Sequence, residues 1–301
     1  MILVHFLLKW ADKLFHVETK NNRHTDIQLK DNQKIYSSTQ ADVIYSKELG
    51  LAKTLFKENK AVKKNALVEY LPHSETKFTL ISIAYSLVRS LMFIYKYKMI
   101  KKYIYKKSKV LDFGSGTGDF LRYIKWRGHK VYGVEPNKLA REISKRKGII
   151  SLPDIKKLKE TKFQAITMWH VLEHLPEPSK TVKSFHKILD KEGIVIIAVP
   201  NLESFDSLHY KNLWAALDIP KHLWHFTSNG LIKIVEKQGF KLVKIFPLWF
   251  DTLYISYLSE KNRSNQFPLL FGLFKGLYFN FKSFRTRNYS SLAFVFKKTT
   301  L

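Results

Sequence analysis

Cysteine is absent from the sequence of 301 residues. Its absence excludes disulfide bonds, zinc sites with thiolate ligands and a cysteine nucleophile. A mechanism that attacks a pyrimidine ring through a thiolate is excluded with that nucleophile. The histidines are scattered and lack the ligand spacing that cysteines or paired carboxylates would support. We therefore predict no metal site.

Arginine is scarce, with 9 residues against 43 lysines, although the formal net charge is +27. The lysines are spread from Lys9 to Lys298 and form no single stripe. Base recognition and bidentate binding of phosphate favour arginine. The composition therefore argues against a nucleic-acid partner. It leaves a general attraction to anions, such as acidic substrates or membrane surfaces.

The sequence also lacks an apolar run that predicts a membrane span. The longest, residues 78–97, is interrupted by Arg89 and Lys96. Residues 1–8 are apolar but have no basic region before them and no small-residue cleavage site after them. We expect a cytoplasmic protein without a transmembrane segment, and contact with a membrane surface stays open.

The centre of the chain alternates between strand-like and helix-like segments. This alternation predicts an α/β fold of Rossmann-like, doubly wound type with a mostly parallel seven-stranded sheet and an antiparallel last strand. The expected strands are 110–113, 131–134, 163–168, 194–199, 240–246 and 291–297. The expected helices are 78–105, 119–127, 138–147, 177–189 and one that Thr227 or Ser228 caps and that ends near Gly239.

Four regions follow from these patterns. Residues 1–76 form an amino-terminal irregular segment, extended only near 27–35, that could cover a substrate. Residues 77–246 form the Rossmann-like domain with its leading helix, with a loop at 201–226. Residues 247–290 are an aromatic helical insertion that covers the pocket, docks on a membrane or packs on the core. The last alternative is favoured because Phe and Leu at helical spacing are usually buried. Residues 291–301 are the final strand.

The loop after the first strand reads Asp112-Phe113-Gly114-Ser115-Gly116-Thr117-Gly118. In a parallel sheet this turn makes the closest approach to a ligand, and its glycines let the backbone come within contact distance. The nicotinamide pattern G-x-G-x-x-G fails, since Asp119 stands at its third glycine, and no Gly-Lys-Ser/Thr follows for a Walker loop. The acid directly before the glycines favours a ligand with positive charge over a pyrophosphate.

Two further elements end at the same edge of the sheet. Glu135 comes 23 residues after Asp112 and could accept hydrogen bonds from both ribose hydroxyls. The segment 163–174 ends the next strand, where Trp169 and His170 could line the adenine or methionine side of a ligand. Glu173 and His174 face the expected position of a methyl acceptor.

The runs VLDFGSGTG, GVEP, VLEHLPEP and Pro200-Asn201 resemble the class I S-adenosylmethionine (SAM)-dependent methyltransferase family over about residues 109–242. The resemblance implies SAM as the cofactor and S-adenosylhomocysteine as its product. The implied cofactor residues are Asp112, Gly114, Ser115, Gly116, Thr117, Gly118, Glu135 and Pro136, with Asp154 and Ile155 near the adenine.

A later run, WAALDIPKHLWHFT, and the segment with Tyr70, His73 and Ser74 resemble a bacterial subgroup of small-molecule methyltransferases. Many of that subgroup carry an amino-terminal zinc ribbon. Without cysteine this chain cannot build one, so either the ribbon is lost or the first seventy residues serve another purpose.

We predict methyl transfer to an O, N or C atom of a small-molecule acceptor, with lipid-linked quinone precursors, sugars, amino acids and phenolics all open. A sugar hydroxyl or carbon acid needs a base, for which His174, beside Glu173, is the first candidate and His222 and His225 are the second. Each histidine also has a purely structural interpretation. The alternatives are an RNA methyltransferase, a non-catalytic binding or scaffold protein and, more distantly, a nicotinamide-dependent reductase.

Overall fold

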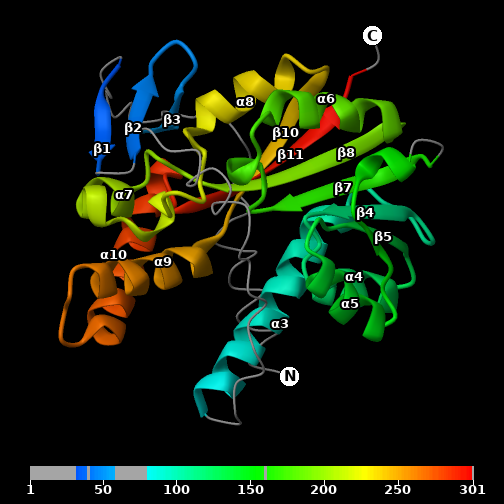
Figure 1. The fold of residues 1–301 in the computed structure, drawn as a ribbon. Coiled ribbons are helices and arrows are strands. Elements are labelled where there is room, and N and C mark those ends of the chain that lie inside the picture. Colours follow the sequence, from blue (N-terminus) through cyan, green and yellow to red (C-terminus); the bar gives the residue numbers. More distant parts are fainter. Residues whose placement is uncertain (1–31, 39–40, 58–79, 159–160, 300–301) are drawn as a thin grey trace.

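A computed structural model of the chain describes residues 32–38, 41–57, 80–158 and 161–299 (Figure 1). Its centre is a seven-stranded sheet with the order β10-β11-β8-β7-β4-β5-β6. All neighbouring strands are parallel except at β11, which runs antiparallel to both β8 and β10. The predicted Rossmann-like α/β class with an antiparallel last strand is therefore confirmed. The strands are β4 (Lys109–Phe113), β5 (Lys130–Val134), β6 (Ser151–Leu152), β7 (Phe163–Trp169), β8 (Leu189–Pro200), β10 (Phe240–Pro247) and β11 (Ser291–Lys298).

Helices cover both faces of this sheet (Figure 1). The sequence of strand β8 is almost continuously apolar because both of its faces are covered. Val195 and Ile197 face one helical layer, and Ile196 and Ala198 face the other. The first layer holds α6 (Pro178–Ile188) and α8 (Ser228–Glu236), and the second holds α3 (Leu80–Lys101) and α4 (Asp119–Trp126). Helix α5 (Lys138–Arg146) follows β5.

Helix ends follow the local sequence. Asn137 accepts a hydrogen bond from the Ala140 N–H at 3.0 Å and so caps α5. Thr227, one of the two predicted caps of α8, accepts from the Gly230 N–H at 3.0 Å. These side chains satisfy amide groups that the first turn of a helix leaves without partners.

A second, four-stranded sheet lies beside the main one, with the order β1-β2-β3-β9 (Figure 1). The prediction of an irregular amino-terminal segment, extended only near 27–35, is wrong for the described residues, and so is the prediction of a single loop at 201–226. Ala41, Val43 and Tyr45 recur at every second position and are buried in β2, and this period predicts a strand. Strand β9 has three residues and pairs with β3, which lies far away along the chain, so its own sequence gives little signal. Tyr70, His73 and Ser74 lie outside the described residues. The elements are β1 (Lys34–Ser37), β2 (Ala41–Ser46), β3 (Leu51–Phe56), α7 (Phe205–Tyr210), β9 (Trp224–Phe226) and the short 3-10 turns η1 (Ile155–Leu158), η2 (Leu172–His174), η3 (Lys211–Leu213) and η4 (Ala215–Leu217).

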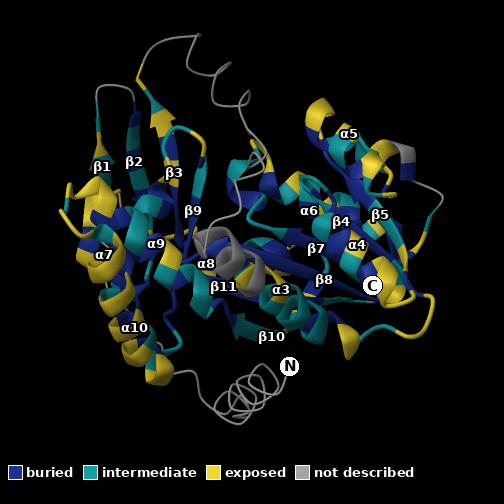
Figure 2. Cartoon of the chain, turned by 90° about the horizontal axis from the view of Figure 1, so that it is seen from below, coloured by how far each residue is buried: buried dark blue, intermediate teal, exposed yellow. Residues whose placement is uncertain are grey.

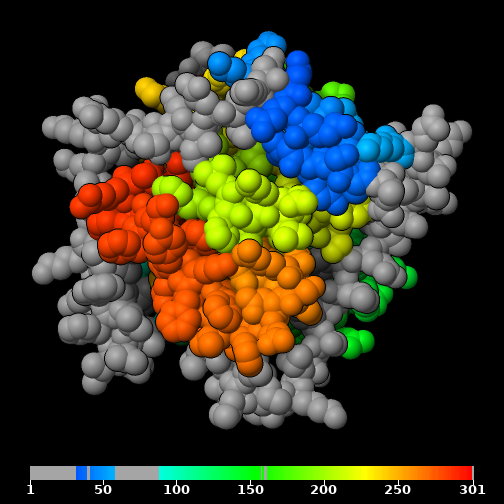
Figure 3. Space-filling model, turned by 90° about the vertical axis from the view of Figure 1, so that its left-hand side faces the viewer, coloured from blue at the N-terminus to red at the C-terminus, as the bar shows by residue number. Residues whose placement is uncertain are grey.

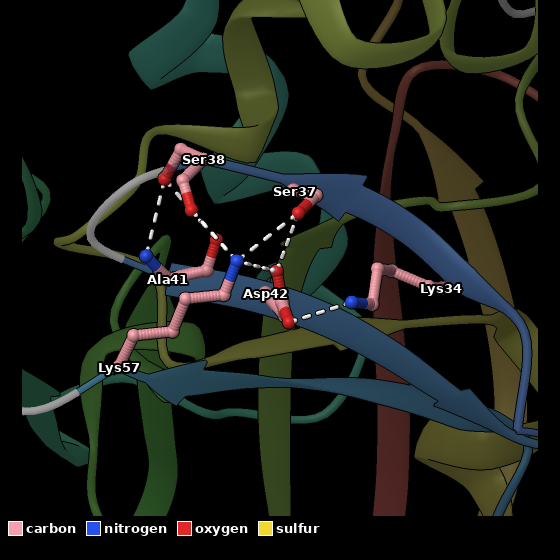
Figure 4. Close-up of polar contacts among 6 residues, drawn as sticks. All are labelled: Lys34, Ser37, Ser38, Ala41, Asp42 and Lys57. Atoms are coloured by element: carbon pink, nitrogen blue, oxygen red, sulfur yellow. Dashed lines mark hydrogen bonds and ion pairs between the residues drawn. The ribbon is translucent and has the colours of Figure 1, made fainter.

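Asp42 ties the edge of the small sheet together (Figure 4). Its carboxylate lies 2.8 Å from Nζ of Lys34 and 2.8 Å from Nζ of Lys57, and it accepts a hydrogen bond from Ser37 at 2.7 Å. The two lysines hold the pKa of Asp42 well below its usual range. Surface ion pairs contribute little stability individually, so the network mainly fixes the register of β1, β2 and the end of β3.

The carboxyl-terminal third contains a helical hairpin of α9 (Trp249–Asn262) and α10 (Pro268–Thr286). Gly272 and Gly276 let the two helices approach closely, since a Cβ on Gly272 would lie 2.4 Å from the Tyr257 Cα. Inside, the hairpin shares a core with the small sheet, where Phe279 and Ile255 pack with Val43. No described helix is long and apolar enough to cross a membrane.

The outward face of α10 is apolar, so the prediction that this region packs on the core holds for Phe279 but not for most of the other phenylalanines of the helix. Phe274 is 65% exposed and Phe281 80% exposed. The glycine face of the helix packs on α9, and many of its other residues are exposed at the surface of the molecule (Figures 2 and 3). The other exposed apolar residues of this hairpin are Tyr254, Phe267, Leu269, Leu270, Phe271, Leu273, Leu277, Tyr278 and Phe284.

Candidate functional site

The glycine-rich loop leaves β4 at the carboxyl edge of the sheet. Gly114, Gly116 and Gly118 all have positive φ. A Cβ at Gly114 would lie 2.3 Å from Cγ2 of Val171, and one at Gly118 would lie 2.4 Å from Oγ of Ser144, so packing explains these two. A Cβ at Gly116 would meet no atom of the described residues within 4 Å. Gly116 thus borders open space, as a backbone that contacts a ligand would.

Glu135 joins this loop to the end of β5. Its Oε2 accepts a hydrogen bond from the Gly116 N–H at 2.9 Å, and its Oε1 accepts one from the Asn137 N–H at 2.8 Å. The Gly114 and Ser115 N–H groups donate to the Val134 carbonyl oxygen at 2.7 and 3.0 Å. The two predicted cofactor motifs are therefore in direct contact, and the buried carboxylate keeps lone pairs for further donors.

Asp112 is buried beside the same loop. Burial raises the pKa of its carboxyl to about 7, although a hydrogen bond from Thr167 Oγ1 at 2.6 Å and the nearby Lys96 act in the opposite direction. Lys96 reaches this region from α3, with Nζ 4.4 Å from the centre of the Trp169 ring. Burial lowers the pKa of Lys96, while Asp251 and Asp112 raise it. The end of β4 thus places a buried acid near a partly buried amine.

The other predicted cofactor residues line the same edge. Ser115 and Ser151 share a hydrogen bond of 2.9 Å, and Thr117 donates to Asp119 at 3.0 Å. Pro136 is exposed, and its carbonyl oxygen accepts from Arg141 at 2.7 Å. Beyond β6, Asp154 accepts a hydrogen bond from the Lys156 N–H at 2.9 Å and Ile155 packs on the core.

Trp169 and His170 are engaged by neighbours at the end of β7. Trp169 packs edge-on to Phe120 with ring centres 5.6 Å apart. His170 has φ of 54° and holds its two ring nitrogens near carboxylates, Nε2 at 2.8 Å from Asp251 and Nδ1 at 3.4 Å from Glu173. Burial would lower the pKa of His170, but these two carboxylates raise it to about 10. The ring is an imidazolium at neutral pH.

Sequence reasoning missed two residues of this site, Lys96 and Asp251. Lys96 was visible only as a charge that interrupts an apolar helix, and such an interruption is a usable signal for a buried functional group. Asp251 lies in the first turn of α9, in the region predicted to be an insertion, and no sequence pattern pairs it with His170. Its placement depends on how the hairpin docks.

Glu173, His174 and His222 converge on the acceptor side. Glu173 is 1% exposed, and the Leu223 N–H donates to its carbonyl oxygen at 2.8 Å, which holds η2 against β9. The His174 and His222 rings lie 4.6 Å apart between centres. Burial lowers the pKa of His222. Burial alone would raise the pKa of Glu173, but the contacts of this carboxylate with His170 and the other histidines outweigh burial and lower the pKa.

His225, the remaining candidate base, is buried behind this group. Its Nε2 lies 3.0 Å from Oγ1 of Thr54, whose hydroxyl donates to the His222 carbonyl oxygen at 2.7 Å. Burial and the nearby His222 lower the pKa of His225 to about 3. His222 and His225 also line a narrow crevice with Pro200, Trp214 and Trp224. With this pKa the His225 ring is neutral at physiological pH.

The sequence matches the methyltransferase domain family over residues 57–245, which include the loop, Glu135 and the histidines. The chain belongs to this family. Membership implies SAM as the cofactor, and the residues fit it: Gly116 borders open space, and Glu135 stands beside it with acceptor oxygens.

Relatives of the methyltransferase domain cover part of the chain. An uncharacterized methyltransferase of Oceanobacillus iheyensis is 35% identical over 146 residues, which are 45% of this chain and 57% of the relative. A ubiquinone biosynthesis O-methyltransferase of Alkalilimnicola ehrlichii is 25% identical over 103 residues, 31% of this chain and 42% of that protein. The chain spans about half the length of these curated relatives.

Among solved structures, a SAM-dependent methyltransferase from Archaeoglobus fulgidus superposes with a TM-score of 0.50 at 22% identity. The superposition covers 70% of this chain and 94% of the other. This structural similarity supports the fold that the family match implies.

Proposed function

We propose that the chain is a SAM-dependent methyltransferase that modifies a small-molecule acceptor. The observation that carries the proposal is Gly116, which faces open space while its N–H contacts Glu135. Around it, Asp112 supplies a carboxylate for a cationic ligand, and Glu135 supplies acceptors for ribose hydroxyls. When bound, SAM would supply an electrophilic methyl group.

The chain itself would hold the reactants in line and exclude water. His174 is the best placed of the candidate bases. It is partly exposed, and its Nδ1 lies 3.1 Å from the Lys221 carbonyl oxygen, so the proton sits on Nδ1 and Nε2 is free to accept one. His222 is buried, and His225 has a pKa of about 3, which makes both weaker candidates.

Calorimetric titration with SAM and S-adenosylhomocysteine tests the cofactor, with NAD as the control ligand. We expect both adenosyl compounds to bind and NAD not to bind. Glu135→Ala removes the acceptors of two backbone N–H groups and should abolish this binding. Failure of the unaltered chain to bind either adenosyl compound would leave the fold intact and favour a non-catalytic scaffold.

The exposed face of the α9–α10 hairpin favours a lipid-linked acceptor over a freely soluble one. Exposed apolar patches of this kind mark interaction sites. Between residues 249 and 287 the hairpin carries six Lys and Arg residues and two acids, Asp251 and Glu260. The acids are engaged by His170 and Lys275, so the surplus charge is positive and complements an anionic bilayer. A relative named for ubiquinone biosynthesis is consistent with this acceptor class.

A further inference from the structure

Glu173, His174 and His222 bring three potential metal ligands together from two segments of the chain. One ligand atom from each lies within 4.8 Å of those of the other two. The first two belong to η2, and His222 comes just before β9. The hydrogen bond between Leu223 and Glu173 keeps the two segments in this register. The prediction of no metal site rested on spacing along the sequence, whereas this proximity is a property of the folded chain.

Hydrogen bonds to carbonyl oxygens determine the tautomer of both histidines. His174 Nδ1 lies 3.1 Å from the Lys221 oxygen, and His222 Nδ1 lies 2.8 Å from the Ala216 oxygen. A carbonyl oxygen only accepts, so each neutral ring carries its proton on Nδ1 and keeps a lone pair on Nε2. Histidines that bind metals usually donate their other N–H group in this manner.

The Glu173 carboxylate and the Nε2 atoms of His174 and His222 can all accept a hydrogen bond or bind a cation, but none of them can donate a hydrogen bond. Within the described part of the chain neither carboxylate oxygen of Glu173 has a hydrogen-bond partner, and the side chain is 1% exposed. His170 Nδ1 lies 3.4 Å from Oε1, which leaves Oε2 unengaged. Two nitrogen lone pairs and a carboxylate cannot hydrogen-bond to one another, so a shared cation would satisfy all three.

We propose that Glu173, His174 and His222 bind a divalent transition-metal ion of the zinc class. Two imidazoles and one carboxylate are a ligand set that zinc accepts while it keeps a further position open. Asp218 Oδ2 lies 4.0 Å from His222 Nε2 and could support the same ion. Of the three residues, His174 is the partly exposed one, so the site is accessible from its side.

The open position would take water or an oxygen atom of the acceptor, an assignment that rests on the proposed function. A metal there lowers the pKa of a coordinated hydroxyl. Because the ion would occupy Nε2 of His174, it would replace that histidine as the group that prepares the acceptor for methylation.

Titration of the chelator-treated full chain with Co²⁺, followed by visible absorption, and with Zn²⁺, followed by calorimetry, tests the site. We expect one ion per chain. Glu173→Gln and His174→Ala should each weaken binding by at least about tenfold, the lower end of the loss seen when only a supporting residue is removed. The control, His209→Ala, changes an exposed histidine outside the cluster and should leave binding unchanged.

The proposal would be overturned if the unaltered chain bound no metal ion, or if both cluster variants bound the ion as tightly as the unaltered chain. It would also be overturned if His209→Ala lost as much affinity as the cluster variants. Melting temperatures identify a folding defect, and the partly exposed His174 decides the result if the Glu173 variant unfolds. SAM titration of the same samples is independent of the metal result and shows separately whether the proposed function fails.

Discussion

Thr54 links the small sheet to the histidine group, because its hydroxyl donates to the His222 carbonyl oxygen at 2.7 Å and its Oγ1 lies 3.0 Å from Nε2 of His225. The Thr54 N–H also donates to the Leu223 oxygen at 3.0 Å. Strand β3 therefore holds the backbone of residues 222–225 in place. The small sheet is a support for the candidate site.

Thr54→Val should destabilise the protein by about 1–3 kcal/mol, since it leaves two buried polar groups without their partner. Urea unfolding measures the loss. Thr54→Ser keeps the hydroxyl and should lose much less. An equal free energy of unfolding for Thr54→Val and the unaltered chain would show that the contacts of Thr54 with the two histidines do not stabilise the fold.

Gly116→Ala should reduce SAM affinity by at least about tenfold, because its methyl group would enter the space that we assign to the ligand. Gly128→Ala is a matched control, since Gly128 also has positive φ and no described residue within 4 Å of a Cβ, but lies in the turn after α4. The two changes carry the same kind of backbone strain. Calorimetry should show a loss only for the first, and equal losses would place the ligand elsewhere.

SAM affinity should rise between about pH 6 and about pH 8 as Asp112, with a pKa of about 7, becomes ionised and attracts the cationic cofactor. Asp112→Asn, which keeps the acceptor for Thr167, should remove most of this dependence. Any ionisation of SAM itself affects both proteins equally and therefore does not contribute to the difference between them. A pH profile that is unchanged in the variant would exclude Asp112 as the cause.

The same group has the opposite effect on stability. Its pKa is raised above the ordinary value of 3.8, so the folded state loses stability as the pH rises from about 4 to about 7. Thermal unfolding should therefore show that Asp112→Asn stabilises the protein more at pH 8 than at pH 4. Equal shifts at both pH values would mean that folding does not raise the pKa of this carboxyl.

A variant with Phe274→Ser and Phe281→Ser should bind vesicles that contain phosphatidylserine at least about tenfold more weakly, since each buried phenylalanine contributes about 1.5–3 kcal/mol. Co-sedimentation measures the binding. The control is Trp126→Ser, which removes an aromatic residue that is 74% exposed on α4. Vesicles of phosphatidylcholine alone should bind the unaltered chain less well. Equal binding by all three proteins would refute the bilayer as the partner of this face.

Patterns within a short stretch of sequence predicted the central sheet and the loop at Gly116, because strand and helix periodicity and glycine turns are local properties. The pairing of β3 with β9, the contact of His170 with Asp251 and the approach of Lys96 to Asp112 arise from tertiary packing. The outward face of α10 could not be predicted either. Its period was correct, but Gly272 and Gly276 decided which side was buried.

The contact between Thr54 and His225 spans 171 residues of sequence. During synthesis from the amino terminus, β1 to β3 leave the ribosome long before β9, so the small sheet lacks its fourth strand until the sheet of the Rossmann-like domain has largely been made. Its closure is a late event of high contact order. A nascent chain that stops before residue 224 would therefore carry the glycine loop, Glu173, His174 and His222 but would lack β9 and His225.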